Sequence, residues 1–442
     1  MADRRARGWT RLAPSVALIG AMVIVASGCG NAAPTPVPSA SATATPTPAT
    51  TPSPSAQSAS PSPASSAEVG ALYDAIEDQV VEIRGLQPRR DVPRRFIDET
   101  ELRTMITEQF DAETPAAYLA GTERLYKALD LIPADADLRD LTLDLLSGGV
   151  AGFYRDDQAT LYVVSRTGLP GVNERITFAH EYDHALQDQN TSVFKDQDGI
   201  LDQTDRILAR QAVYEGDASL VMTLWASTHF GLADLAELLA LGNDPEALAL
   251  LERMPPVMRE TLVFPYTTGL SFVQGAQLQD GWPAVDALYD RMPESTEQIL
   301  HPDAYQAREH PVVVDLPDDL AAQLGDGWSV PLEDTFGEFQ LGIWLRGAGA
   351  ALTNADTAAA GWGGDRLAVL DGPGDAWGMV LETTWDTAQD ATEFLDAAQP
   401  AVDGLFSPAR ISAPAGKAVT ILIASDDDTL LALDVLFGDT GV

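Results

Sequence analysis

Apolar residues in the first half of the chain recur at helical spacing. Two sets fall three or four positions apart: Leu72, Ile76, Val80 and Ile83, and then Leu102, Ile106 and Phe110. This spacing places each set on one face of an amphipathic helix. We therefore expect residues 67–145 to be mainly helical, with these side chains in the core.

The pattern then changes to short extended runs and back to helices. The stretch GFYRDDQATLYVV, residues 152–164, has two β-prone runs around a polar centre and predicts a hairpin. Helices are expected at about 173–189 and 204–225, and further helical patterns continue to about residue 289. The proline-punctuated stretch 302–332 is typical of a connection.

The last part of the chain alternates strand-like and helix-like segments. Its strand-like runs are RLAVLD, WGMVLETTWD, ARISA and AVTILIAS, with helical patterns near 387–399 and 427–437. The order is close to ββαββα and predicts a compact α+β domain over 335–442. We therefore expect an α+β protein: a mainly helical domain at 67–334 with a small hairpin or edge sheet, then this smaller domain.

The N-terminal residues have the pattern of an export signal. Four arginines precede the apolar run 16–26, and the small residues Ala26, Ser27 and Gly28 follow. A basic start, a short apolar run and small residues before a cleavage point predict a signal peptide over residues 1–28. The apolar run is short for a membrane-spanning helix.

Cys29, the only cysteine of the chain, directly follows this signal. The arrangement resembles the lipobox of bacterial lipoproteins, in which the cysteine receives a diacylglycerol. It predicts a protein anchored by lipid to the extracytoplasmic face of the cell membrane. The alternative is an ordinary secretion signal followed by a chance cysteine.

A low-complexity segment separates Cys29 from the expected fold. From Asn31 to Ser66, 33 of 36 residues are Ala, Pro, Ser or Thr. Such a composition cannot bury enough apolar surface to fold, so we expect a disordered stalk over 29–66. The formal net charge of −39 argues against nucleic acid as a partner, and against adhesion to anionic lipid headgroups.

The chemistry-bearing motif is FAHEYDH, residues 178–184. On a helix, His180 and His184 lie on one face one turn apart, and both can bind one Zn²⁺. Glu181 then lies beside the metal, where a general base is needed.

A catalytic zinc site needs a third protein ligand and one open position. Glu215, in LARQAVYEGDASLVM, falls on an otherwise small or apolar helical face, so it is the expected third ligand. The alternative is a structural salt bridge to an arginine. Arg210 lies about 140° around the same helix, so that arginine would come from another element.

HEYDH followed on a later helix by Glu215 resembles the gluzincin class of zinc metallopeptidases, which have a thermolysin-like arrangement. The segments AHEYDHALQDQ, YEGDASLVM, FPYTTGLSF, STEQILHP and GWGGDR also resemble a group of exported bacterial proteins taken to be metallopeptidases. In many gluzincins an aspartate follows the third ligand by four residues. Here that position is Ser219, and the candidates for an orienting carboxylate are Asp183, Asp188 and Asp217.

The resemblance implies zinc-dependent hydrolysis of peptide or protein substrates. Glu181 would take a proton from the zinc-activated water that attacks the peptide carbonyl, and would pass it to the leaving amine. Tyr266 and His301 are candidate donors to the tetrahedral intermediate. A tyrosine with a satisfied hydroxyl and a helix-end histidine are the structural alternatives. The hairpin 152–164 precedes the motif where gluzincins keep an edge strand, which could pair with a peptide.

Two other functions fit parts of the sequence. One is a catalytically inactive lipoprotein that binds a ligand or a partner protein outside the membrane. The intact set His180, Glu181, His184 and Glu215 argues against it, because a decaying enzyme usually loses a ligand or the base. The other is a structural zinc site, which normally takes a fourth protein ligand, and no cysteine beyond Cys29 is available.

Overall fold

The computed structural model describes residues 66–147, 151–164, 170–195, 200, 202–412 and 416–437. The predicted signal peptide, Cys29 and all but the last residue of the predicted stalk lie outside these residues. None of the helices in the described part of the chain is both long and apolar enough to cross a bilayer.

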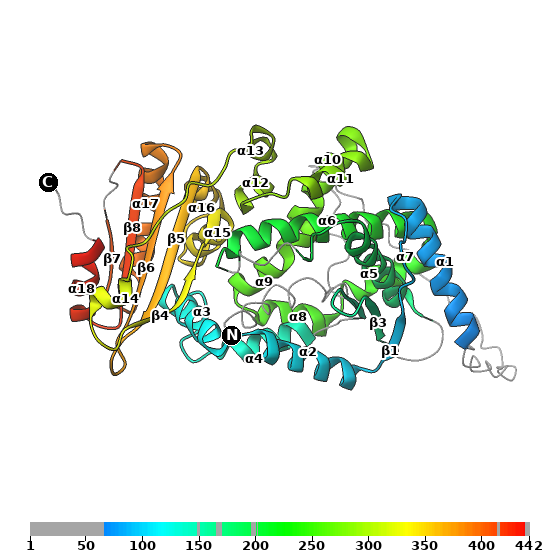
Figure 1. The fold of residues 1–442 in the computed structure, drawn as a ribbon, viewed down its shortest axis with the longest axis horizontal. Helices are drawn as coiled ribbons and strands as arrows, with labels where there is room; N and C mark the ends of the chain where they lie inside the picture. Colours follow the sequence, from blue (N-terminus) through cyan, green and yellow to red (C-terminus); the bar gives the residue numbers. More distant parts are fainter. Residues whose placement is uncertain are drawn as a thin grey trace, which may run out of the picture.

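The fold is α+β and dominated by helices, as the sequence predicts (Figure 1). The helices are α1 (Ser66–Arg84), α2 (Glu99–Glu113), α3 (Ala116–Ala128), α4 (Leu138–Ser147), α5 (Val172–Asn190), α6 (Thr204–His229), α7 (Leu232–Leu241), α8 (Pro245–Arg253), α9 (Pro256–Phe264), the π-helix η2 (Pro265–Gly269), α10 (Leu270–Asp280), α11 (Trp282–Asp290), α12 (Thr296–Leu300), α13 (Pro302–Ala307), α14 (Leu320–Leu324), α15 (Gly337–Gly347), α16 (Leu352–Ala359), α17 (Ala388–Asp403) and α18 (Asp427–Phe437). The strands are β1 (Arg94–Ile97), β2 (Gly152–Arg155), β3 (Thr160–Val164), β4 (Ser329–Asp334), β5 (Trp362–Asp371), β6 (Trp377–Trp385), β7 (Ala409–Ile411) and β8 (Ala418–Ala424).

The smaller sheet has the strand order β1-β3-β2. Strands β2 and β3 pair antiparallel, so the predicted hairpin is confirmed. Strand β1 pairs parallel to β3 and lies within residues 67–145, which were expected to be helical. Strand β2 is at the edge of this sheet and lies against α5, where it can reach the residues of the HEYDH motif.

Helices α5 and α6 carry the residues of chemical interest. Both were predicted, and both extend slightly beyond the expected bounds. They pack against each other in the interior of the helical part of the molecule. The first turn of α6 is held by the larger sheet: the main-chain N–H of Thr204 donates to Asp334 at 2.6 Å, and the Thr204 hydroxyl donates to the same carboxylate.

The larger sheet has the order β4-β5-β6-β8-β7 and lies at one end of the molecule (Figure 1). From β5 to α18 the elements follow the predicted order ββαββα. Strand β4 joins the same sheet by pairing antiparallel with β5, so the sheet begins at Ser329. The domain boundary expected at residue 335 stays a prediction.

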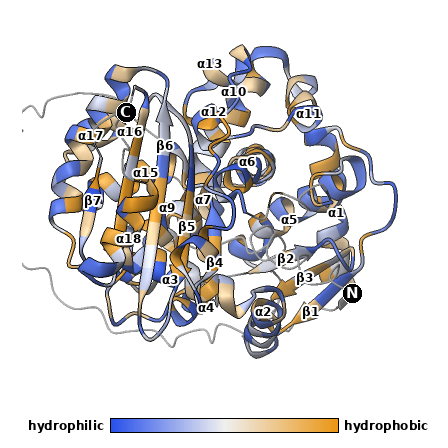
Figure 2. Ribbon diagram, turned by 60° about the vertical axis from the view of Figure 1, so that its left-hand side comes forward, coloured by the Kyte–Doolittle hydropathy of each residue, from blue (hydrophilic) through white to orange (hydrophobic). Residues whose placement is uncertain are grey.

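Apolar side chains pack on both faces of the larger sheet. Figure 2 shows stretches of hydrophobic residues along its strands. One face packs against α15, α16, α17 and α3, with Trp344 and Phe394 among the buried aromatic residues. The opposite face packs against α14 and α18 through Leu320 and Leu433. Burial on both faces explains the uninterrupted apolar runs LAVL in β5, MVL in β6 and ILIA in β8.

Candidate metal centre

Two histidines of α5 point to one place. His180 and His184 are one turn apart, and their Nε2 atoms lie 3.0 Å from each other. Both residues are fully or almost fully buried. Two imidazole nitrogens that close together need either a shared proton or a shared cation between them.

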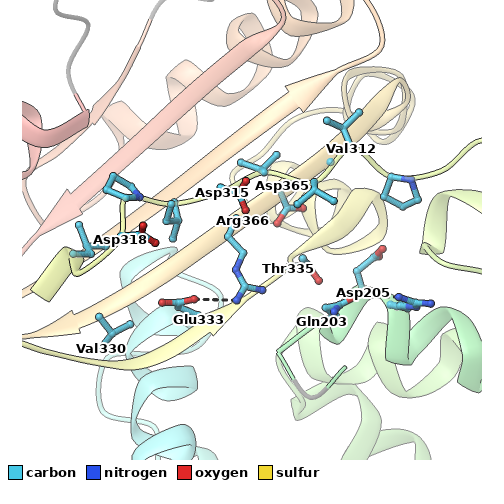
Figure 3. A pocket seen from close by; sticks show the side chains of 18 of the residues that line it. Gln203, Asp205, Val312, Asp315, Asp318, Val330, Glu333, Thr335, Asp365 and Arg366 are labelled. Atoms are coloured by element: carbon cyan, nitrogen blue, oxygen red, sulfur yellow. Dashed lines mark hydrogen bonds and ion pairs between the residues drawn. The ribbon is translucent and has the colours of Figure 1, made fainter. Parts of the chain in front are cut away.

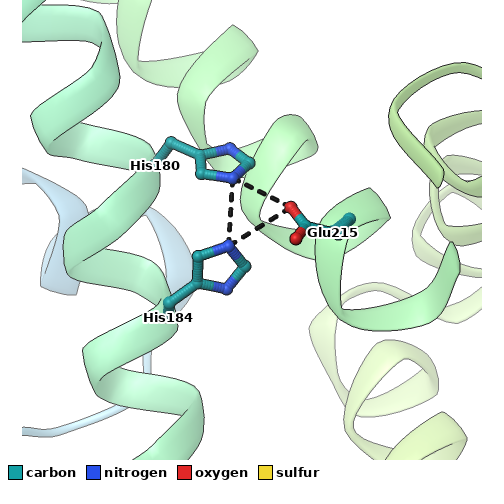
Figure 4. A group of neighbouring side chains, drawn as sticks. All are labelled: His180, His184 and Glu215. Atoms are coloured by element: carbon teal, nitrogen blue, oxygen red, sulfur yellow. Dashed lines mark hydrogen bonds and ion pairs between the residues drawn. The ribbon is translucent and has the colours of Figure 1, made fainter. Parts of the chain in front are cut away.

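Glu215 of α6 completes the group (Figure 4). Its Oε2 atom lies 3.1 Å from Nε2 of His180 and 3.3 Å from Nε2 of His184. The carboxylate is fully buried, and its ion-pair partners are the two histidines rather than an arginine. The salt bridge to an arginine that the sequence left open is therefore not the arrangement that Glu215 adopts.

A hydrogen-bond chain fixes the tautomer of His184. The side-chain amide of Gln187 donates to Asp183 and to the main-chain oxygen of Tyr214, each at 2.9 Å. Its oxygen therefore faces Nδ1 of His184, at 2.9 Å, and can only accept. Nδ1 carries a proton, so Nε2 is the nitrogen that faces His180 and Glu215 and that binds either a second proton or a metal ion there.

Glu181 is positioned by strand β2. Its Oε2 accepts a hydrogen bond of 2.8 Å from the main-chain N–H of Tyr154. Its other oxygen is buried and has no hydrogen-bond partner among the described residues. Burial raises the pKa of Glu181 to about 8, so this carboxylate has a stronger affinity for a proton than an exposed glutamate.

The charges around the three residues favour a cation. Burial lowers the pKa of His184, but the carboxylates of Glu215 and Glu181 raise it more, to a value of about 10. The pKa of Glu215 is lowered because the nearby histidines outweigh the effect of burial. Burial lowers the pKa of His180, so this ring is the neutral one of the pair.

The donor set fits a zinc ion. Zinc bound at about 2.1 Å by three ligands at tetrahedral angles holds the donor atoms about 3.4 Å apart. The three separations here are 3.0, 3.1 and 3.3 Å. Two imidazoles and one carboxylate leave a fourth position open. Glu181, which has one oxygen without a hydrogen-bond partner among the described residues, is close enough for its charge to raise the pKa of His184.

Tyr266 lies beside this group, on the π-helix η2. Its ring centroid is 6.0 Å from that of His180, and the side chain is partly exposed. Burial and the charges of Glu215 and Glu181 raise the pKa of its phenol well above the ordinary value. The hydroxyl therefore keeps its proton and can donate it in a hydrogen bond.

A glycine crossing holds η2 against α6. A Cβ atom on Gly216 would lie 2.5 Å from the main-chain oxygen of Gly269, and one on Gly269 would overlap the main chain of Ala212. The two helices therefore touch backbone to backbone directly beside Glu215. This contact places Tyr266 beside His180, although the two residues are far apart in the sequence.

His301 lies elsewhere. It caps α13, and its Nε2 atom pairs with Glu338 of α15 at 2.8 Å. About half of its side chain is exposed, and Glu338 and Glu297 raise its pKa. The structure thus brings together His180, Glu181, His184, Glu215 and Tyr266, and it pairs His301 with a different acidic group.

The candidate orienting carboxylates have different partners. Asp183 reaches His184 through Gln187, which the sequence reasoning missed although it lies three residues after His184. Asp188 accepts from Tyr154 and Arg90. Asp217 forms a buried ion pair of 2.9 Å with Arg84, a partner 133 residues away that no local pattern indicates.

An uncharged cavity of about 250 Å³ begins at Tyr266. Residues of α4, α6 and α9 line it. On α6 the lining extends to Gln211, which is one turn before Glu215. Its lining is mostly apolar, with threonines, tyrosines and one glutamine and no charged side chain. In a chain with 66 acidic residues, this lining is distinctive.

A larger cavity of about 670 Å³ lies between the larger sheet and the segment 311–321 (Figure 3). Its lining mixes apolar residues with charged ones, which include Asp205, Glu333, Asp365 and Arg366. Arg366 forms ion pairs with Glu333 at 3.0 Å and with Asp202 at 2.7 Å. None of the three converging ligand residues lines this cavity.

The comparisons with known proteins concern the C-terminal part alone. The model of a domain of unknown function (DUF8575) matches residues 326–433, which hold the larger sheet from β4 to most of α18. No curated protein and no solved structure matches the chain. The matched range does not include His180, His184 or Glu215.

Proposed function

We propose that this chain is a zinc-dependent peptidase. The observation that carries the proposal is the buried convergence of His180, His184 and Glu215, with Glu181 directly beside them. The protonated Nδ1 of His184 supports it, because this tautomer directs a lone pair to the shared point.

Each residue has a role in this proposal. His180, His184 and Glu215 would hold the zinc, which supplies a Lewis acid that lowers the pKa of water and polarises a carbonyl. Glu181 takes a proton from the attacking water and returns it to the leaving amine. The N–H of Tyr154 holds one oxygen of Glu181 and leaves the other free for this proton.

The role proposed for Tyr266 is to stabilise the tetrahedral intermediate. Its phenol lies close to the ligand residues, comes from a separate element and keeps its proton. A donor in that position stabilises the negative charge that develops on the carbonyl oxygen. His301, paired with Glu338, is the weaker candidate for this role.

The uncharged cavity at Tyr266 supports a preference for apolar substrates. A cavity of this size and lining accepts one large aliphatic or aromatic side chain. We propose that it receives such a side chain next to the scissile bond. The substrate is then a peptide or protein segment with a large apolar residue at that position.

We also propose that the enzyme is exported and anchored through lipid on Cys29. The basic start, the apolar run and the small residues before Cys29 support this location. Replacing Cys29 by serine should release the protein from the membrane fraction of the producing cells. If the variant stayed in that fraction like the wild type, another anchor would have to be sought.

The deciding experiment measures metal and activity on the same preparations. Wild-type protein should hold about one zinc per chain by mass spectrometry, and Glu215→Ala should lose most of it. Glu181→Gln should keep the zinc but lose peptide hydrolysis by about 100-fold or more. Glu174→Gln, on the first turn of the same helix, is the matched control and should behave as wild type.

The outcomes separate the alternatives. Zinc with no hydrolysis of any peptide in a broad library would favour a metal-containing binding protein. Absence of zinc from the wild type after loading at neutral pH would overturn the metal centre itself. The library also tests the cavity, since cleavage beside small and charged residues alone would contradict its assignment.

A further inference from the structure

A second group of acidic side chains lies away from the metal centre. Glu297 on α12, Glu309 after α13 and Asp386 after β6 each direct a carboxylate oxygen to one region, and these oxygens lie within 4.8 Å of one another. The three residues come from separate parts of the chain. No element of the proposed zinc site contributes to the group.

Glu297 is the unusual member, because most of the residue is buried and its carboxylate has no partner among the described residues. Only 5% of its surface is exposed. Its carboxylate makes no hydrogen bond or ion pair within the part of the chain that the structure describes. An ionised carboxylate in this situation is costly unless a cation or a proton neutralises it.

The neighbouring groups increase this cost. Burial and the negative charges of Glu338, Asp386 and Glu309 raise the pKa of Glu297 to about 8, and His301 offsets only part of the effect. The His301 ring pairs with Glu338. The ammonium of Lys417 donates to the main-chain oxygen of Asp386, not to its carboxylate. Among the described residues, no cationic side chain forms a hydrogen bond or ion pair with these three carboxylates, although the charge of nearby Lys417 lowers the pKa of Asp386 in part.

The donor atoms indicate the class of ligand. All three are carboxylate oxygens, which favour hard cations. Calcium binds oxygen at about 2.3–2.6 Å, so ligands across the ion are up to about 5 Å apart, in agreement with the spacing here. Calcium also tolerates irregular geometry and takes water at its remaining positions, and the exposed Glu309 leaves room for water.

We propose that Glu297, Glu309 and Asp386 bind one calcium ion. Glu297 and Glu309 belong to the predicted domain 67–334, and Asp386 directly follows strand β6 of the larger sheet. The ion therefore links α12 and the segment after α13 to the end of β6. Its role is to hold these two parts of the molecule together, independently of the proposed peptidase activity.

Thermal unfolding of the full chain, loaded with zinc and freed of calcium, tests the proposal. Millimolar calcium should raise the melting temperature of the wild type by several degrees, and magnesium should raise it much less. Glu309→Gln and Asp386→Asn should lose most of this rise. Glu252 is an exposed glutamate on α8, so Glu252→Gln changes the net charge by the same amount. This control should keep the calcium-dependent rise in melting temperature.

Calorimetric titration with calcium chloride provides the second measurement. The wild type should bind one ion per chain, with an affinity at least tenfold higher than that of either cluster variant. An equal thermal shift in the wild type and both cluster variants would assign the effect to the acidic surface as a whole and overturn the site. Absence of both heat and thermal shift in the wild type would also overturn it.

Discussion

Nδ1 of His184 donates to the side-chain oxygen of Gln187 at 2.9 Å, within the same helix. Both hydrogens of the Gln187 amide are taken, by Asp183 and by the main-chain oxygen of Tyr214. Gln187 therefore cannot turn its amide around without losing two hydrogen bonds. It holds the ring of His184 in the orientation and the tautomer that a metal ligand requires.

Replacing Gln187 by methionine keeps the length of the side chain but removes the acceptor. We expect the zinc affinity to fall about 10- to 100-fold, because Nδ1 of His184 loses the partner that fixes its proton. Competition with a chelator of known affinity measures this change. Gln79→Met on α1, whose side chain accepts from Trp225, is the control and should leave the affinity unchanged.

Replacing Tyr266 by phenylalanine removes only the hydroxyl. We expect kcat for peptide hydrolysis to fall about 100-fold while zinc content and KM change little, since the role proposed for the phenol is to stabilise the transition state. Tyr162→Phe on β3, whose hydroxyl pairs with Gln158, should keep full activity. An unchanged kcat in Tyr266→Phe would assign the oxyanion donor to another group.

The elements around the site were largely readable from the sequence. The spacing of apolar residues and the HEYDH motif predicted α5 and α6, and the alternation of residues 152–164 predicted the β2–β3 hairpin. These are local signals, in which the period of the pattern follows directly from the geometry of one element. His180, His184 and Glu215 also converge in the structure, and their role as metal ligands stays a prediction.

Features that depend on distant partners were not readable. Strand β1 is only four residues long and owes its existence to parallel pairing with β3. The segment 302–332, expected to be a connection, contains α13, α14 and the first four residues of β4. The pair Arg84–Asp217 joins residues 133 positions apart. In each case tertiary contacts, not the local pattern, decide the structure.

The buried ion pair between Arg84, the last residue of α1, and Asp217 is predicted to stabilise the folded protein. Arg84 is almost fully buried, and it also contacts Asp286 at 2.7 Å. Arg84→Met should lower the free energy of unfolding by about 3–5 kcal/mol, because Asp217 becomes a buried charge without its partner. Urea denaturation measures this loss. Arg139→Met, which breaks a surface pair with Asp111, should leave the stability close to that of the wild type.

Adding Asp217→Asn to the Arg84→Met variant sharpens this test. The second change removes the unpaired charge, so the double variant should recover part of the lost stability. A double variant less stable than Arg84→Met would show that Asp217 contributes mainly through its hydrogen bond with Tyr289.

Two buried aspartates of the larger sheet predict a dependence of stability on pH. Burial raises the pKa of Asp334 and of Asp365 to about 6, whereas an aspartate in an unfolded chain titrates at about 3.9. The folded protein thus holds these protons to a higher pH. Their contribution to stability is fully present below about pH 4 and is lost as the pH rises through about 6.

Comparison of the wild type with Asp365→Asn isolates this effect. Between pH 4 and 7 the free energy of unfolding of the wild type should fall by about 3 kcal/mol relative to that of the variant, because the pKa of Asp365 is about two higher in the folded than in the unfolded protein. Denaturant unfolding at a series of pH values measures the difference. A difference that stays constant over this range would contradict the raised pKa of Asp365.

The backbone contact between Gly216 and Gly269 also bears on how related proteins can be recognised. Any side chain at either position would push η2 away from α6 and carry Tyr266 out of reach of His180. The residues that line the cavity at Tyr266 face no such restriction and are free to diverge with the substrate. For the proposed peptidase, a distant relative that cleaves other peptides should therefore be recognised more reliably by this pair of glycines than by the residues that line the cavity.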